Sequence, residues 1–135
     1  MKIKALSLWQ PWATAIALGK KRYETRSWKT SYRGRLLICS AKKPLDEVAL
    51  HTSSFVIKGV FNPELFPLGV SICTCDLVDC LQITEDLIYS TNRNERVLGY
   101  WGIGRYAWKL ENVVPVAPIP IKGYQGLFTV DYEGF

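Results

Sequence analysis

The chain has 135 residues, 48% of them hydrophobic and 21% charged, a composition that predicts one soluble globular domain over residues 1–135. The formal net charge of +5 favours an anionic partner, with RNA or a nucleotide first. No apolar run approaches the ~20 residues of a membrane-spanning helix, and Met1–Lys4 leads straight into patterned structure rather than a signal peptide, so we expect a cytoplasmic protein with reduced thiols.

The first half of the chain alternates strands and helices. Ile3–Leu8 alternates in hydropathy as a strand does. A helix is predicted from Gln10 to Gly19, with Pro11 at its first position and a glycine at its end. A short charged strand (22–28) and a buried strand (35–40) follow, and Pro44 with two acidic residues after it predicts a helix over 42–55.

The second half is dominated by extended segments. Residues 69–81 form a long predicted strand, interrupted by Asp76 and Asp79, where we expect a bulge or a bend. The other expected elements are a loop over 59–68, an irregular or helical excursion over 84–96, strands at 106–110 and 127–132, an extended segment at 113–121 and a loop at 122–126. The predicted fold class is α+β: a small, mostly antiparallel β-barrel with two or three flanking helices.

The four cysteines indicate buried thiols rather than a metal site. Cys73 and Cys75 lie two apart in a predicted strand, so they share a face and do not bridge each other. Their spacing with Cys80 and His51 fits no zinc pattern. A nucleophilic pair of His51 with Cys39 has no local signature. We therefore expect no metal and no cofactor.

The densest group of chemically capable side chains lies between Ser7 and Trp28. Glu24 and Arg26 share one face of the predicted charged strand, where they either pair with each other or offer an acceptor and a donor fork to a ligand. Lys21 just precedes this strand. A desolvated lysine can act as a base or nucleophile, whereas most lysines are solvated ion-pair partners.

Aromatic and loop residues complete the predicted site. Trp9 and Trp28 lie at strand ends, where a ring can stack on a nucleobase, whereas Trp12 lies on the helix and is assigned to the core. Gln10 either reads a base edge or caps the helix. The remaining candidates for ligand contact are Ser7 and, from the 122–126 loop, Lys122, Gly123 and Gln125.

Four segments resemble the ASCH domain family (activating-signal-cointegrator homology), which is part of the PUA-like superfamily. They are SLWQPWA at Ser7–Ala13, GKKRYETRSW at Gly19–Trp28, the strand end at Leu77–Asp79 and IPIKGYQGLF at Ile119–Phe128. The most specific part is the series of Gly19, Lys21, Glu24 and Arg26. The resemblance spans nearly the whole chain and implies a PUA-like barrel with a cleft for RNA or nucleotides.

The resemblance implies three possible functions. The first is an RNA- or nucleotide-binding domain with a basic, aromatic-lined cleft. The second is a hydrolase, because some ASCH proteins are similar to amidohydrolases that deacetylate modified cytidine and others are linked to RNA cleavage. Glu24 stands where the amidohydrolase type has a threonine, so hydrolysis here would use Lys21, Glu24 and an attacking water. The third is a protein-interaction adaptor in transcription regulation.

Overall fold

The structure is a computed structural model that describes residues 1–45, 51 and 63–134. The predicted helix over 42–55 lies mostly outside the described residues, and the part from Lys42 to Leu45 is not helical. No helix in the described part of the chain is long and apolar enough to cross a bilayer.

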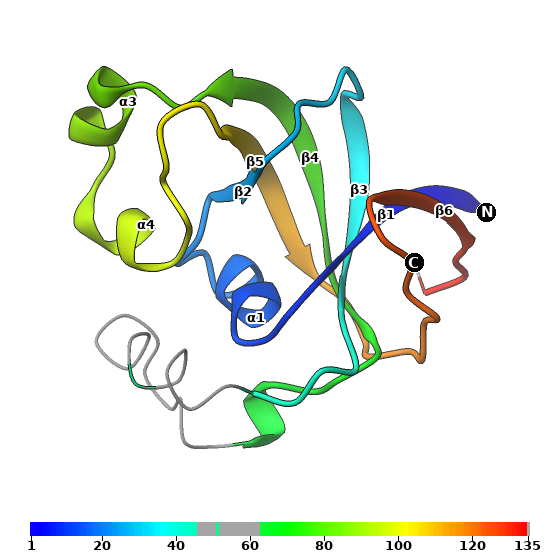
Figure 1. Cartoon of the computed structure of the whole chain (residues 1–135). Helices are drawn as coiled ribbons and strands as arrows, with labels where there is room; N and C mark the ends of the chain where they lie inside the picture. Colours follow the sequence, from blue (N-terminus) through cyan, green and yellow to red (C-terminus); the bar gives the residue numbers. More distant parts are fainter. Residues whose placement is uncertain (46–50, 52–62, 135) are drawn as a thin grey trace.

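Six strands form one sheet in the order β2-β5-β4-β3-β1-β6 (Figure 1). The strands are β1 (Lys2–Leu8), β2 (Tyr23–Arg26), β3 (Gly34–Ser40), β4 (Ser71–Gln82), β5 (Tyr106–Pro115) and β6 (Leu127–Asp131). Only β1 and β3 pair in parallel; the other neighbours are antiparallel. The predicted α+β class and its mostly antiparallel sheet are confirmed.

The sheet is open rather than closed into a barrel, and this corrects one part of the prediction. The strands at the two ends of the order, β2 and β6, have four and five residues. Among the described residues, β2 pairs only with β5 and β6 only with β1. The strand pattern in the sequence predicts how many strands there are, but closure depends on whether the two end strands meet.

The long strand β4 is bent where its acidic residues interrupt the apolar run, as predicted. Its pairing with β5 shifts register between Thr74 and Asp76, and again between Leu77 and Asp79. Asn112 on β5 adopts a φ of 54° opposite the first shift, and its Nδ2 donates to Asp76 Oδ2 at 2.8 Å. Such irregularities leave a residue unpaired and increase the local twist of the sheet.

Helix α1 (Trp12–Ala17) lies against one face of the sheet (Figure 1). It is shorter than predicted, because Pro11 precedes the first turn as its cap and Gly19, with a φ of 73°, ends the helical segment. The Oε1 atom of Gln10 accepts a hydrogen bond from the backbone N–H of Thr14 at 2.9 Å. Gln10 therefore satisfies a donor that the start of the helix leaves free.

The polar excursion over 84–96 forms two short helices, α3 (Glu85–Ser90) and α4 (Arg93–Val97), beside the β2–β5 end of the sheet (Figure 1). Each helix has a side-chain cap: Thr84 Oγ1 accepts from Leu87 N, and Asn92 Oδ1 accepts from Glu95 N. A 3₁₀ turn, η1 (Pro63–Leu65), lies in the predicted loop.

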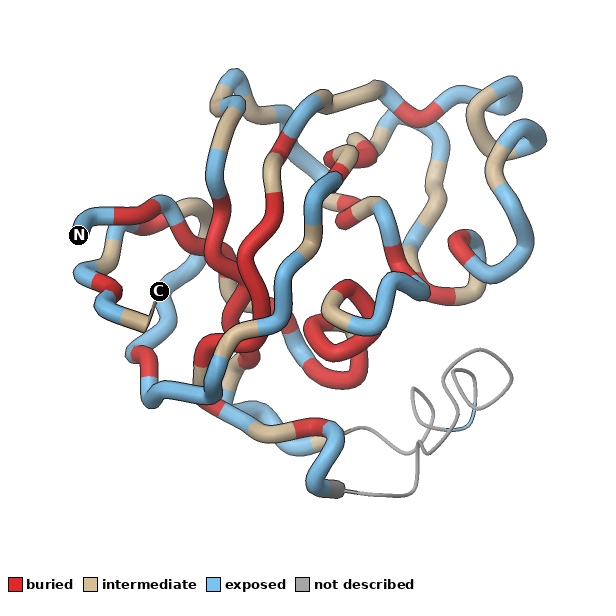
Figure 2. Tube along the Cα trace, turned by 180° about the vertical axis from the view of Figure 1, so that it is seen from behind, coloured by how far each residue is buried: buried red, intermediate tan, exposed pale blue. Residues whose placement is uncertain are grey.

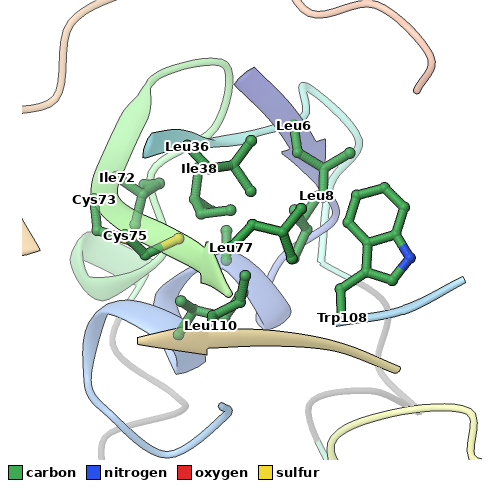
Figure 3. Packing of buried hydrophobic residues seen from close by; sticks show 12 residues of the cluster. Leu6, Leu8, Leu36, Ile38, Ile72, Cys73, Cys75, Leu77, Trp108 and Leu110 are labelled. Atoms are coloured by element: carbon green, nitrogen blue, oxygen red, sulfur yellow. The ribbon is translucent and has the colours of Figure 1, made fainter. Parts of the chain in front are cut away.

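Both faces of the central strands are buried (Figure 2). The larger cluster fills the space between the sheet and α1 (Figure 3) and comprises Leu6, Leu8, Ala13, Ile16, Leu36, Ile38, Ile72, Cys73, Cys75, Leu77, Trp108 and Leu110. A second cluster covers the other face of β1 and β3 and comprises Ile3, Ala5, Leu37, Cys39, Ile121, Phe128 and Tyr132. Burial on both faces explains why β3 has a continuous apolar run instead of alternation.

The cysteines are free thiols, and three of them belong to these clusters. Burial raises the pKa of Cys39 and of Cys75 to about 12 from an ordinary 9.0, and it also raises the pKa of Cys73. These thiols stay protonated at neutral pH. In particular, Cys39 is not an activated nucleophile for a pair with His51.

We predict that alkaline pH destabilises the protein through these thiols. Above pH 9 the unfolded chain loses thiol protons that the folded chain retains, so the free energy of unfolding falls by about 1.4 kcal/mol per pH unit for each thiol, up to the raised pKa. Urea unfolding of the wild type and of Cys75→Ala between pH 8 and 11 measures this. The free energy of unfolding should fall less steeply with pH in Cys75→Ala than in the wild type. Equal slopes in the two proteins would contradict a raised pKa for Cys75.

A buried carboxylate attaches β2 to the helical excursion. Glu95 is 2% exposed, and its two oxygens accept hydrogen bonds from the backbone N–H groups of Arg22 and Tyr23, each at 3.0 Å. Its backbone carbonyl accepts from Trp101 Nε1 at 2.9 Å. The start of β2 is therefore held in place by a residue more than seventy positions away in the chain.

We predict that Glu95→Ala lowers the free energy of unfolding by about 3 kcal/mol, because it leaves two backbone donors without their charged acceptor. Urea unfolding monitored by tryptophan fluorescence measures the loss. The matched control is Glu111→Ala, which removes an exposed carboxylate 3.8 Å from Lys109 and should cost less than about 0.5 kcal/mol. Similar losses in the two variants would contradict this role for Glu95.

Candidate functional site

A cleft of about 1230 Å³ lies where the end of β1, the strand β2 and the segments preceding β5 and β6 meet. The residues that line it are Ser7, Leu8, Trp9, Trp12, Lys21, Glu24, Thr25, Arg26, Trp28, Ser40, Ala41, Lys42, Gly69, Val97, Leu98, Gly99, Tyr100, Arg105, Ile121, Lys122, Gly123, Tyr124, Gln125 and Gly126. Segments distant in the sequence therefore form one surface.

Nine of the ten predicted ligand-contact residues line this cleft: Ser7, Trp9, Lys21, Glu24, Arg26, Trp28, Lys122, Gly123 and Gln125. The exception is Gln10, which is 2% exposed. Its Nε2 donates to Thr14 Oγ1 at 2.8 Å and to the Pro67 carbonyl at 3.1 Å. Of the two roles considered for Gln10, the structure therefore shows the helix-capping one, and its amide faces the protein interior.

Lys21 lies at the floor of the cleft, and its side chain is only 1% exposed. Its ammonium group donates to the backbone carbonyl of Leu98 at 2.8 Å and lies 3.5 Å from Glu24 Oε1. It is therefore neither a solvated surface lysine nor an isolated buried charge. Because it holds the Leu98 carbonyl, Lys21 also positions the segment that leads to β5.

The carboxylate of Glu24 lies between two cations. On the side away from Lys21, Glu24 Oε2 accepts a hydrogen bond from Arg26 Nε at 3.0 Å and lies 2.9 Å from the terminal guanidinium nitrogen Nη2 of Arg26. Arg26 Nη2 also donates to the carbonyl of Ser7 at 3.3 Å, which joins β2 to the end of β1. Lys21, Glu24 and Arg26, which we call the floor triad, have a formal net charge of +1.

The alternation of β2 divides its side chains as predicted. Glu24 and Arg26 lie on one face and pair with each other. Thr25 lies on the opposite face, toward the loop before β5, where its Oγ1 accepts a hydrogen bond from Tyr100 N at 3.1 Å. Gly99 lies between the two sides: a Cβ there would be 3.2 Å from Thr25 Oγ1 and 3.3 Å from Lys21 Nζ. The absence of a side chain at Gly99 lets the loop lie directly on β2.

The rim of the cleft carries exposed aromatic rings with basic side chains over them. Lys43 Nζ lies 3.4 Å from the centre of the Trp9 ring, which is 56% exposed. The guanidinium of Arg105 lies 4.3 Å from the centre of the Tyr100 ring, and Lys122 Nζ lies 5.6 Å from that of Tyr124. Such contacts at exposed sites contribute about 0.5–1 kcal/mol each.

Two tryptophans of the cleft lining also pack against buried residues. Trp28 is 38% exposed and packs edge-on against buried Trp108, with ring centres 4.7 Å apart. Trp12, assigned to the core, does pack against the larger buried cluster but also lines the cleft. One edge of the cleft wall is therefore part of the core.

Gly123 brings the loop before β6 onto the end of β1. A Cβ at this position would lie 3.0 Å from Ser7 Oγ and 3.2 Å from Ser7 Cβ, so one of the two residues would have to shift by a few tenths of an ångström. Ser7 and Gly123 both line the cleft at this point.

Sequence reasoning missed the rim residues supplied by loops, namely Lys43, Gly99, Tyr100, Arg105 and Tyr124. A partial signal existed, since Tyr100 and Arg105 flank a glycine-containing segment typical of an exposed loop. Nothing local indicated that this loop faces Lys21. Within residues 1–45, 51 and 63–134, no group of three His, Cys, Asp or Glu side chains could hold a metal ion.

The fold and the cleft define a PUA-like α+β domain with a basic floor and an aromatic rim. Residues 6–124 match the family model of the ASCH domain, so the chain belongs to the ASCH domain family.

Two curated relatives are similar over part of the chain. Activating signal cointegrator 1 from Homo sapiens is 43% identical over 81 residues, and its Mus musculus counterpart is 40% identical over 81 residues. Each match covers 56% of this chain but only 14% of the relative. The chain thus corresponds to a small part of those proteins.

Solved structures of an ASCH protein from Zymomonas mobilis share the fold. One superposes with a TM-score of 0.64 at 19% identity, over 96% of this chain and 88% of that chain. A tyrosine-to-phenylalanine variant gives 0.60 at 18% identity, covering 97% and 91% of the two chains. A serine-to-alanine variant gives 0.59 at 18%, covering 95% and 87%.

We predict strong energetic coupling within the floor triad. Glu24→Ala should lower the free energy of unfolding by about 3 kcal/mol, because it leaves Lys21 and Arg26 without their counter-charge in a desolvated place. The double variant Lys21→Met with Glu24→Ala should lose about 1–2 kcal/mol less than the sum of the two single losses. Urea unfolding of the four proteins measures the coupling.

Asp131→Ala is the control for this cycle, since it breaks an exposed ion pair of 2.8 Å with Lys2 and should cost less than about 1 kcal/mol. Additive losses at Lys21 and Glu24 would show that the two groups do not depend on each other.

Proposed function

We propose that the cleft binds RNA or nucleotides, with a base stacked at the aromatic rim and a phosphate or base oxygen at the floor triad. The observation that carries this proposal is the combination of a desolvated, net-positive triad with exposed rings that line the same cleft. A nucleotide offers both features at once, a planar π-face and an anion.

The electrostatics of the floor favour an anionic or strongly polar group. Arg26 has a side chain 25% exposed, so its guanidinium is partly accessible while Glu24 fixes its orientation. A guanidinium held in this way can direct its remaining donors at a phosphate or a carbonyl oxygen. Because the triad is largely removed from water, attraction between its net charge and a ligand is less screened than on an open surface.

The rim supplies affinity that does not depend on base identity. Base–aromatic stacking contributes about 1–3 kcal/mol per base, and every nucleobase has a π-face. Trp9 and Trp28 are both exposed enough to offer part of a ring. Ser7 and Gln125 add polar groups at the same surface.

We predict that Arg26→Ala weakens binding of a fluorescein-labelled octauridylate by about tenfold at 50 mM salt, which corresponds to roughly 1.4 kcal/mol. Arg26→Lys should be intermediate, because it retains the charge but loses the planar fork. Fluorescence anisotropy measures both. The control Lys4→Gln removes an exposed charge from β1, outside the cleft lining, and should change the affinity less than twofold. Absence of any wild-type affinity at low salt would contradict the proposal.

A hydrolase is the second candidate, favoured by one observation. Lys21 and Glu24 form a buried amine–carboxylate pair at the floor of the cleft, where general acid–base chemistry is possible. The reaction would add water to the acyl carbon of an N4-acylated cytidine and break the C–N bond, releasing the carboxylic acid and cytidine. We assign no nucleophilic role to Thr25, because it lies on the opposite face of β2 from Glu24 and Arg26, where its hydroxyl accepts the Tyr100 N–H.

Incubation with N4-acetylcytidine, followed by chromatography, tests the hydrolase. Turnover by the wild type that is lost in Lys21→Met but retained in Lys4→Gln would favour it. If the protein binds RNA but turns over neither N4-acetylcytidine nor other acylated cytidines, the hydrolase is contradicted and only the binding function remains.

A further inference from the structure

We infer that the cleft holds at least three separate nucleotide subsites, so that its ligand is a single-stranded RNA segment rather than a mononucleotide. Each subsite consists of one exposed aromatic ring and the basic side chain lying over it. This inference rests on the proposed function and extends it from the kind of ligand to the ligand's length.

Three such pairs occur around the cleft, and we call them the rim pairs. They are Trp9 with Lys43, Tyr100 with Arg105, and Tyr124 with Lys122. All three rings line the cleft, and the two tyrosines are 69% and 57% exposed. Exposed rings also occur elsewhere on the surface, Tyr89 among them, but these three lie around one cleft and each has a cation over it.

The rim pairs come from different parts of the fold. Trp9 lies in the turn between β1 and α1, Tyr100 in the loop between α4 and β5, and Tyr124 in the segment before β6. A single base stacked on one of these rings leaves the other two pairs unused. The distribution of the pairs around one cleft therefore fits a chain of nucleotides better than one nucleotide.

The cation in each pair does not block the subsite. Stacking of a base on an aromatic ring is stronger than a cation–π contact at an exposed position, so an incoming base displaces the cation from the ring face or takes the opposite face. Lys43 and Lys122 have flexible stems, and the displaced ammonium remains close enough to meet the phosphate of the same nucleotide. One pair thus supplies both contacts that a nucleotide needs.

The volume of the cleft also fits a ligand of several nucleotides. Pockets for small molecules typically have volumes of about 300–1000 Å³. The cleft of about 1230 Å³ exceeds that range. The floor triad then contacts one of several nucleotides, and the rim pairs contact others.

Binding of uridine monophosphate and of oligouridylates of two, three, four and six nucleotides to the full chain tests the inference. By calorimetry at 50 mM salt, we expect affinity to rise at least about fivefold with each nucleotide up to three. For the tetranucleotide, the plot of log affinity against log salt should have a slope near −2, because three phosphate contacts contribute about −0.7 each.

The variants Lys43→Gln, Arg105→Gln and Lys122→Gln should each reduce the slope by about 0.7, whereas Lys4→Gln should leave it unchanged. Arg105 also donates to the Tyr100 carbonyl, so thermal unfolding of that variant establishes that it is folded.

An affinity that does not increase beyond the mononucleotide, with binding still dependent on Arg26, would overturn the subsites and leave the proposed function intact. No binding at any length would overturn both. Slopes unchanged in all three rim variants would also overturn the assignment of the cations.

Discussion

The position of the Glu24 carboxylate is the constraint on which the site depends. It lies on a four-residue end strand, yet it is almost buried, with Lys21 on one side and Arg26 on the other. The ammonium of buried Lys21 and the guanidinium of half-buried Arg26 repel each other, and removing either charge from water without a partner is costly. The carboxylate makes their proximity possible. It therefore also determines that the floor of the cleft keeps one net positive charge.

The same strand joins the distant parts of the fold. On one side, Arg26 reaches the Ser7 carbonyl at the end of β1. On the other, backbone groups of Arg22 and Tyr23 donate to Glu95, and Lys21 donates to the Leu98 carbonyl. These contacts hold the loop that presents Tyr100. A floor fixed by buried hydrogen bonds and a rim of exposed side chains are thus parts of one arrangement.

The sequence predicted those features that depend on local periodicity. The alternation of β2 placed Glu24 and Arg26 on one face, and the interruptions at Asp76 and Asp79 became register shifts in β4. Features that depend on long-range contacts could not be predicted from local periodicity. Nothing near Glu95 in the sequence indicates that its carboxylate binds the start of β2.

Two further outcomes show where local patterns are ambiguous. The amide of Gln10 could have faced a ligand or a helix end, and its contacts with Thr14 and Pro67 show that it faces the interior. The open sheet is a similar case, because strand patterns do not report whether β2 and β6 approach each other. The cleft residues were predicted from their chemistry and local placement together with the family resemblance, whereas the rim pairs emerge only when the loops are placed in space.

A ligand that occupies the cleft between the floor triad and the rim lies beside some of the five tryptophans and not others. Their indole N–H signals can be followed by ¹H–¹⁵N NMR while a short oligouridylate is added. Trp9 and Trp28 line the cleft, whereas Trp101 is held by the Glu95 carbonyl outside it. We predict that the signals of Trp9 and Trp28 shift and that of Trp101 does not. Saturable binding that leaves the Trp9 and Trp28 signals unmoved would contradict the account.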